Sequence, residues 1–207
     1  QIRIRVISIP PGWEVHGNLT ASLPHHSCLG RRHFSSRARK HRFARNWVCP
    51  ERVCSLCLFD MRRLTTSTPL AAVEAACFPP QEAADIDQLA NRVESYPNHF
   101  WLLVNPAEPD NDCFPAQVDD GMLVSFIDGP CVGSPDLTDD MYASTALHAD
   151  DAPWQMILGV NTAPMYQHRG CASFLMRHVI LDSALSHRHG IVLACKEKML
   201  PFYSSFG

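Results

Sequence analysis

The chain has 207 residues and a formal net charge of -3, with 46% hydrophobic and 19% charged residues. This length and composition predict one globular domain with a sizeable core, not a disordered or fibrous chain. No stretch of 18 or more apolar residues is present, so we expect no membrane-spanning helix and no membrane partner. The nine cysteines are scattered and no signal-peptide core precedes them, which favours a reduced, cytoplasmic location.

Charge is distributed unevenly along the chain. Residues 1–63 hold 12 Lys and Arg against three acids, whereas residues 64–207 hold six basic and 18 acidic residues. We therefore predict a basic extension over 1–57, disordered or non-native, and a folded domain over 58–207. Three interpretations of the extension stay open: sequence upstream of a true start at Met61, an organelle-targeting presequence, or a nucleic-acid-binding arm.

Nucleic acid is the partner that we expect least, and no metal site is predicted. Cys49, Cys54 and Cys57 lie close together, but zinc usually takes four ligands in two close pairs, and no second pair lies near them. The oligomeric state has no signal in the sequence.

From residue 58 onward the pattern alternates between strands and helices. Pro69 follows Ser67 or Thr68, which is typical of a helix start, and Pro79 with Pro80 ends that helix. Apolar residues at helical spacing predict a second helix. The expected elements are a strand over 58–64, the helix that opens at Pro69, a helix over 84–96, a strand over 100–104 and an exposed connection over 105–120.

The sequence pattern in the second half of the chain predicts the remaining strands and helices of an α/β fold. We expect Gly190 to end the long helix in a left-handed conformation. The strand after it is nearly all apolar, as expected when both faces are buried. The expected elements are strands over 122–127, 154–160 and 191–195, a short helix over 137–143, a long helix over 171–189, and a short C-terminal helix with Tyr203.

The turn over 167–172 reads QHRGCA and joins the strand at 154–160 to the long helix. A turn of this kind directs backbone N–H groups toward one point at a helix N-terminus, which suits a phosphate group. Gly170 leaves room for a ligand beside the backbone, and Ala172 keeps the first helical turn open. A glycine in a strand-to-helix turn is common, so this motif taken alone favours an ordinary connection.

Further motifs give the turn its context. In chain order they are the segment 74–79 (EAACFP), the strand from Gly121 to Gly129, the turn 167–172, and the segment 200–206 (LPFYSSF). Together they resemble the GNAT superfamily of N-acetyltransferases, and within it the arylalkylamine (serotonin-type) enzymes and their microbial relatives. The resemblance covers roughly residues 58–207.

The resemblance implies a GNAT-type α/β fold with a mixed, mostly antiparallel sheet flanked by helices, and acetyl-CoA as co-substrate. It implies that Tyr203 protonates the departing thiolate and that Val160 and Thr162 lie along the pantetheine arm. It also implies that the turn binds the pyrophosphate. The cofactor-binding residues expected in this turn are Gln167, His168, Arg169, Gly170, Cys171 and Ala172.

The predicted reaction is acetyl transfer from acetyl-CoA to a small amine by direct attack. The vertebrate arylalkylamine enzymes carry two histidines where this chain has Met156 and Leu158, so another group must take the amine's proton. We expect His148 in this role, with Asp150 beside it; Asp139 and Asp140 are weaker candidates. An acidic domain favours a cationic amine, and we expect the acceptor slot to be lined by Phe78, Pro79 and Phe126, unless these residues belong to the core.

The resemblance also predicts two more strands after Tyr203. The chain stops at Gly207, so we expect a fold truncated before its last strands, with an exposed strand edge and an apolar patch. A non-catalytic product, either an inactive fragment or an acyl-CoA-binding relative, therefore remains the alternative function.

Overall fold

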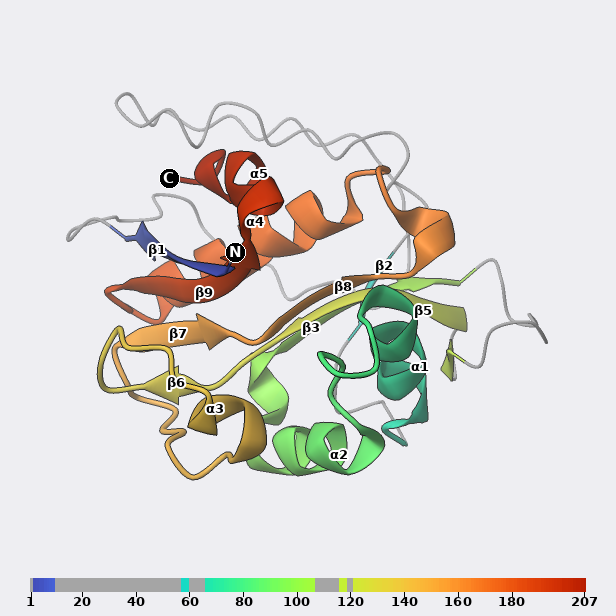
Figure 1. Ribbon diagram of the computed structural model, residues 1–207, viewed down its shortest axis with the longest axis horizontal. Coiled ribbons are helices and arrows are strands. Elements are labelled where there is room, and N and C mark those ends of the chain that lie inside the picture. The colour runs from blue at the N-terminus through green and yellow to red at the C-terminus, as the bar shows by residue number, and fades with distance from the viewer. Residues whose placement is uncertain (1, 10–56, 60–65, 107–115, 119–120) are drawn as a thin grey trace.

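The computed structural model describes residues 2–9, 57–59, 66–106, 116–118 and 121–207 (Figure 1). The described elements form a mixed α/β fold, as predicted. Among the described residues, no helix combines the length and apolar character needed to cross a membrane. The strands are β1 (Ile2–Ser8), β2 (Cys57–Phe59), β3 (Phe100–Asn105), β4 (Gln117–Val118), β5 (Gly121–Asp128), β6 (Cys131–Val132), β7 (Trp154–Ile157), β8 (Gly159–Thr162) and β9 (Gly190–Lys196). The helices are α1 (Thr68–Cys77), α2 (Ile86–Ser95), α3 (Asp140–Ala143), α4 (Cys171–Leu185) and α5 (Leu200–Ser204), with short 3-10 turns at Pro97–His99, Pro164–Tyr166 and Glu197–Met199.

The strands form two sheets that meet between β7 and β8. One sheet has the order β1-β9-β7-β6, and the other has the order β2-β3-β5-β4 with β8 also paired to β5. Only the pair β7–β9 is parallel; the remaining described pairs are antiparallel. The mixed, mostly antiparallel arrangement expected from the sequence is therefore confirmed for the described strands.

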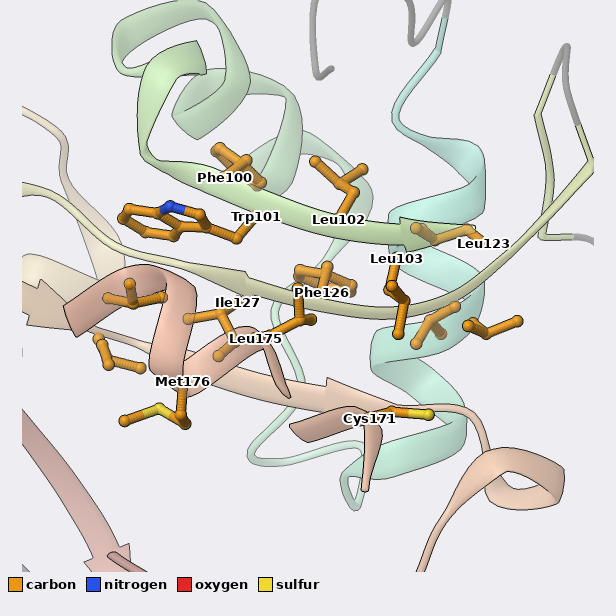
Figure 2. Packing of buried hydrophobic residues seen from close by; sticks show 14 of the residues in the cluster. Phe100, Trp101, Leu102, Leu103, Leu123, Phe126, Ile127, Cys171, Leu175 and Met176 are labelled. Atoms are coloured by element: carbon orange, nitrogen blue, oxygen red, sulfur yellow. The ribbon is translucent and has the colours of Figure 1, made fainter. Parts of the chain in front are cut away.

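Helices cover both sides of the sheets. Helices α4 and α5 lie on one side, and α1, α2 and α3 lie on the other (Figure 1). Figure 2 shows side chains of β3 and β5 meeting Cys171, Leu175 and Met176 of α4. Leu102, Leu103 and Phe126 are fully buried there, so the core explains why these strands read as continuous apolar runs.

Two predicted helix starts are confirmed, and one predicted helix end is wrong. Pro69 lies in the first turn of α1, and Asp85 and Gln88 form a reciprocal capping box at α2. Gly190, however, belongs to β9, and His187 takes the left-handed conformation after α4, with φ 55°. A Cβ on residue 190 would lie 2.7 Å from the Ile7 carbonyl oxygen, so close approach of β1 requires this glycine.

The connection between β3 and β5 is partly buried. Ala116 has no exposed surface. It precedes β4, which pairs with the first residues of β5. The prediction of an exposed connection is therefore wrong for Ala116, while residues 107–115 lie outside the described residues.

β1 covers one edge of β9. Ile2 to Ser8 pair antiparallel with Lys196 to Gly190 along the whole length of β9. Ile7 is 2% exposed and belongs to the main core, whereas Ile4 is 60% exposed. Residues 2–8 therefore contribute a strand to the sheet, although the sequence placed them in the basic extension; residues 10–56 lie outside the described part.

We expect Ile7→Ala to lower the free energy of unfolding by about 2–4 kcal/mol, because it removes a fully packed side chain and leaves a cavity. Ile4→Ala is the matched control, since the same strand loses an exposed side chain, and it should change stability by less than about 0.5 kcal/mol. Urea denaturation of both variants measures the difference. Equal, small effects would show that β1 does not pack on β9.

Candidate functional site

The two sheets separate at Leu158, and the separation forms a fork. β7 pairs with β9 up to Ile157, which lies opposite Leu193. One residue later the chain enters β8, which pairs with β5 on one side only among the described strands. β8 then runs beside β5, away from β9 (Figure 1). The predicted single strand over 154–160 is thus two strands, whose divergence opens the sheet.

Backbone groups along one edge of β8 face this opening. The Ala163 N–H donates to the Val124 carbonyl oxygen of β5. Backbone groups alternate between the two edges of a strand, so the N–H groups of Val160 and Thr162 point toward the fork. The Thr162 carbonyl oxygen accepts from the Gln167 side chain at 3.1 Å and from the Cys77 thiol at 3.2 Å, and not from β5. The Val160 and Thr162 N–H groups thus lie on a strand edge that has no partner strand among the described residues, and an extended ligand can lie beside it.

The turn 167–172 lies where β8 leads into α4, as predicted. His168 and Gly170 have positive φ, 58° and 94°. Gly170 is the N-cap of α4 and has no side chain that can satisfy the first amides of the helix. Among the described residues, no backbone carbonyl accepts a well-formed hydrogen bond from the amides of residues 168–173. The Cys171 amide contacts its own thiol, and the other amides of this helix N-terminus fit an anionic oxygen group.

The side chains of the turn have other roles. Gln167 ties the turn to the end of β8 through its bond to Thr162. The Arg169 guanidinium lies 5.2 Å from the centre of the Tyr166 ring and is exposed, while the Cys171 side chain is buried. Burial raises the pKa of the Cys171 thiol, which keeps it neutral. Among the six residues of the turn, the backbone is therefore the main candidate for phosphate binding, with Arg169 free to reorient.

Tyr203 lies on α5, which follows β9 on the same side of the sheet as α4 (Figure 1). It is 7% exposed, and its hydroxyl makes no hydrogen bond to another described residue. Burial and the neighbouring Cys195 raise its pKa above the ordinary value of 10. Tyr203 is therefore protonated at neutral pH, which is the state that a proton donor needs.

His148 lies beside β6, where Cys131 and Asp150 hold its ring. Its Nδ1 accepts the backbone N–H of Cys131 at 3.1 Å, and its Nε2 lies 3.2 Å from Asp150. Cys131 and His99 contact Gln155, which precedes Thr162 by seven residues, or roughly 20 Å of extended chain. His148 therefore lies away from the turn, and its role as the base stays a prediction. Asp139 and Asp140 are exposed at the start of α3.

His99, His148 and Asp150 also have the spacing of a metal site, with ligand atoms within 4.8 Å of one another. The hydrogen bonds argue against this use. Because His148 Nδ1 is an acceptor, its Nε2 carries the hydrogen and donates to Asp150, leaving no lone pair for an ion. Burial and the nearby His99 lower the pKa of His148, so this neutral form prevails at pH 7. We assign no metal to this cluster.

Glu74 is a site residue that the sequence reading missed. It lies on α1 and is 4% exposed. One carboxylate oxygen accepts the Ala84 N–H at 3.1 Å, and the other lies close to the Asn161 side chain without a well-formed hydrogen bond. Burial, and next the nearby Asp128 carboxylate, raise its pKa from 4.5 to about 7. A glutamate four residues after Leu70 and three before Cys77, on the apolar stripe of a helix, was the available signal.

Other buried polar groups surround Glu74. Asp128 of β5 forms an ion pair with Arg92 of α2 at 3.1 Å, and both side chains are at most 5% exposed. Asn161 of β8 is fully buried. Phe126, which was expected as a candidate for the acceptor slot, is fully buried in the core; Phe78 is half-buried and Pro79 is exposed. Polar side chains therefore lie on the α1 side of the fork, whereas Phe126 belongs to the core.

The raised pKa of Glu74 predicts a pH-dependent stability. The native state holds this proton up to about pH 7, whereas the unfolded chain releases it near pH 4.5. Its contribution to stability is therefore complete at low pH and is lost as the pH rises to about 7, by at most about 3 kcal/mol. Glu74→Gln keeps the Ala84 bond and should remove this loss.

Urea denaturation at pH 5 and pH 8 measures this effect as the difference between wild type and Glu74→Gln. Glu94→Gln, which changes an exposed carboxylate of α2, is the control and should follow the wild type. Parallel behaviour of all three proteins would contradict a raised pKa at Glu74.

The comparisons with known proteins support the fold. No family model and no curated protein match the chain. Among solved structures, the loading GNATL domain of CurA from Lyngbya majuscula is 18% identical, with a TM-score of 0.51 over 67% of this chain and 62% of that one. The GphF GNAT-like decarboxylase in complex with isobutyryl-CoA is 20% identical, with a TM-score of 0.45 over 62% and 58%. The chain thus spans less than two thirds of either structure, and its fold is GNAT-like.

Proposed function

We propose that this protein is an N-acetyltransferase that moves an acetyl group from acetyl-CoA to an amine. The proposal rests on two adjoining sets of backbone groups. One is the edge of β8 that has no partner strand among the described residues, and the other is the amides of residues 168–173. A thioester cofactor has an extended amide-containing arm that ends in a pyrophosphate. The first surface suits the arm and the second suits the pyrophosphate.

In this proposal, Val160 and Thr162 hold the pantetheine arm through their backbone N–H groups, and the turn holds the pyrophosphate. The acetyl group then lies toward Leu158, where the fork closes. The amine nitrogen attacks the thioester carbonyl, and Tyr203 donates its proton to the departing sulfur. Binding both reactants in one fork lowers the entropic cost of bringing them together, which accelerates the reaction.

We propose arylalkylamines as the first class of acceptor to test, because segments 74–79 and 200–206 resemble the arylalkylamine N-acetyltransferases. One observation favours the alternative of an acyl-CoA-binding protein without catalysis. Met156 is fully buried and Leu158 is half-buried, and neither can take a proton. Turnover, and not binding alone, distinguishes the two functions.

We expect Gly170→Val to abolish acetyl-CoA binding while the protein stays folded, because a β-branched residue strains a backbone at φ 94° and covers the amides. Isothermal titration calorimetry measures the affinity, and circular dichroism checks the fold. Met165→Val, at an exposed position of the preceding 3-10 turn, is the control. Retained affinity in Gly170→Val would rule out the turn as the pyrophosphate site.

We expect Tyr203→Phe to lower kcat by roughly 10²–10⁴ if Tyr203 is the proton donor. The affinity for acetyl-CoA should not change, since the variant keeps the packing of the ring. Steady-state rates with acetyl-CoA and 2-phenylethylamine, together with calorimetry, separate the two quantities. A rate near that of the wild type would remove Tyr203 from the mechanism.

A further inference from the structure

β1 is the last strand of its sheet, and its outer edge has no partner strand among the described residues (Figure 1). The Ile9 N–H donates to the His189 carbonyl oxygen, which shows which backbone groups face β9. Backbone groups alternate between the two edges of a strand, so the odd-numbered residues of β1 face β9. The N–H and C=O groups of Ile2, Ile4 and Val6 therefore point away from the sheet.

The same three residues form an exposed apolar stripe, which we call the β1 stripe. Ile2 is 72% exposed, Ile4 is 60% exposed and Val6 is 40% exposed. Side chains alternate between the faces of a strand, so all three lie on one face. The stripe continues onto β9, where Val192 lies opposite Val6 and packs with Met156. Adjoining exposed apolar residues of this kind are typical of an interaction surface.

β1 lacks the features with which proteins usually protect a sheet edge, namely short length, proline, a bulge or a charge. It has seven residues, no proline and an unbroken register with β9. Its two charged residues lie on the face opposite the β1 stripe. There Arg3 forms an ion pair with Glu197 at 3.3 Å, and Arg5 donates to the Gly207 carbonyl oxygen. Such an edge is a template for another strand.

The β1 stripe is complementary to itself. Its three β-branched side chains are spaced evenly about Ile4. An antiparallel pairing of two β1 strands centred on Ile4 places Ile2 of one copy opposite Val6 of the second copy, and Ile4 opposite Ile4. Each of these residues then exchanges both backbone hydrogen bonds with the residue opposite it. A twofold axis through the centre repeats every contact, as in an isologous dimer.

The charges favour a second copy over residues 10–56 as the occupant of this edge. Residues 10–56 hold eight Lys and Arg against two acids, and β1 carries two arginines, so this segment and the edge have like charge. Residues 64–207 hold six basic and 18 acidic residues, so a second copy brings an acidic body to the basic edge. It also brings Glu197 beside its own Arg3, which offsets the arginines that the pairing brings together.

We propose that β1 of one copy pairs antiparallel with β1 of a second copy, centred on Ile4. The two four-stranded sheets then join into one sheet across the twofold axis, and the two β1 stripes lie side by side on one face. The contact is confined to one strand of each copy, so the dimer is small and reversible. It lies on the outer edge of β1, away from the fork, and does not depend on the proposed function.

Sedimentation velocity of the full chain tests the dimer at protein concentrations from about 1 to 200 µM, the range of weak complexes. The wild type should pass from monomer to dimer, with no larger species. Ile4→Lys places two ammonium groups at the axis and should raise the dimer Kd at least about tenfold. Leu147→Lys is the matched control. Leu147 is 54% exposed and lies beside β6, at the other end of the sheet, so this variant should dimerise like the wild type.

A pair of charges tests the register. Ile2→Lys and Val6→Glu should each weaken the dimer, because each sets one charge against an apolar side chain. The double variant should recover most of the affinity, since each ammonium group lies opposite a carboxylate of the second copy. Within one strand the two positions are roughly 13 Å apart, so a bond inside one copy cannot explain recovery. Absence of recovery would exclude the antiparallel pairing centred on Ile4.

Hydrogen exchange identifies what covers the edge. The Ile4 and Val6 amides should be protected at high protein concentration and exchange rapidly at low concentration. Protection at every concentration would assign the edge to another segment of the same chain and contradict the proposal. A wild type that is monomeric throughout, or a dimer that Ile4→Lys leaves unchanged, would overturn it. Circular dichroism of each variant checks that the substitution at an exposed side chain leaves the fold intact.

Discussion

The site depends on a single break in the hydrogen-bonding between strands. β9 pairs with β7 up to Ile157, and β5 pairs with β8 from Gly159 onward. The chain changes its pairing partner from β9 to β5 as it passes from β7 into β8, so the sheet opens at Leu158. An unpaired strand edge inside a fold is costly unless it faces a ligand or water. The cores built around α4 and β5 hold the two arms apart and keep that edge available.

The opening has a different chemistry on each side of the sheet. Toward α4 lie the amides of the turn and the strand edge, which offer donors to an anion. Toward α1 lie Glu74, Asp128 and Asn161, which are buried polar side chains with both acceptor and donor atoms.

The histidine cluster and Glu74 show how the surroundings of a titratable side chain change its pKa. His148 was a reasonable candidate because histidine titrates near neutral pH. In the structure its ring is held by the Cys131 amide and by Asp150, at the far end of β7 from the turn. Glu74, of a type that is ordinarily ionised at neutral pH, has its pKa raised to about 7 because α1 buries it against β8.

The sequence by itself determined the elements that local rules control. Pro69 marked the start of α1, apolar spacing gave α2 and α4, and Gly170 marked the turn, because periodicity and backbone preference act over a few residues. Only the tertiary structure decided the break at Leu158, the pairing of β1 with β9, and the meeting of Glu74, Asp128 and Asn161. These features join segments far apart in the chain, and no local pattern records which strand pairs with which or which acid becomes buried.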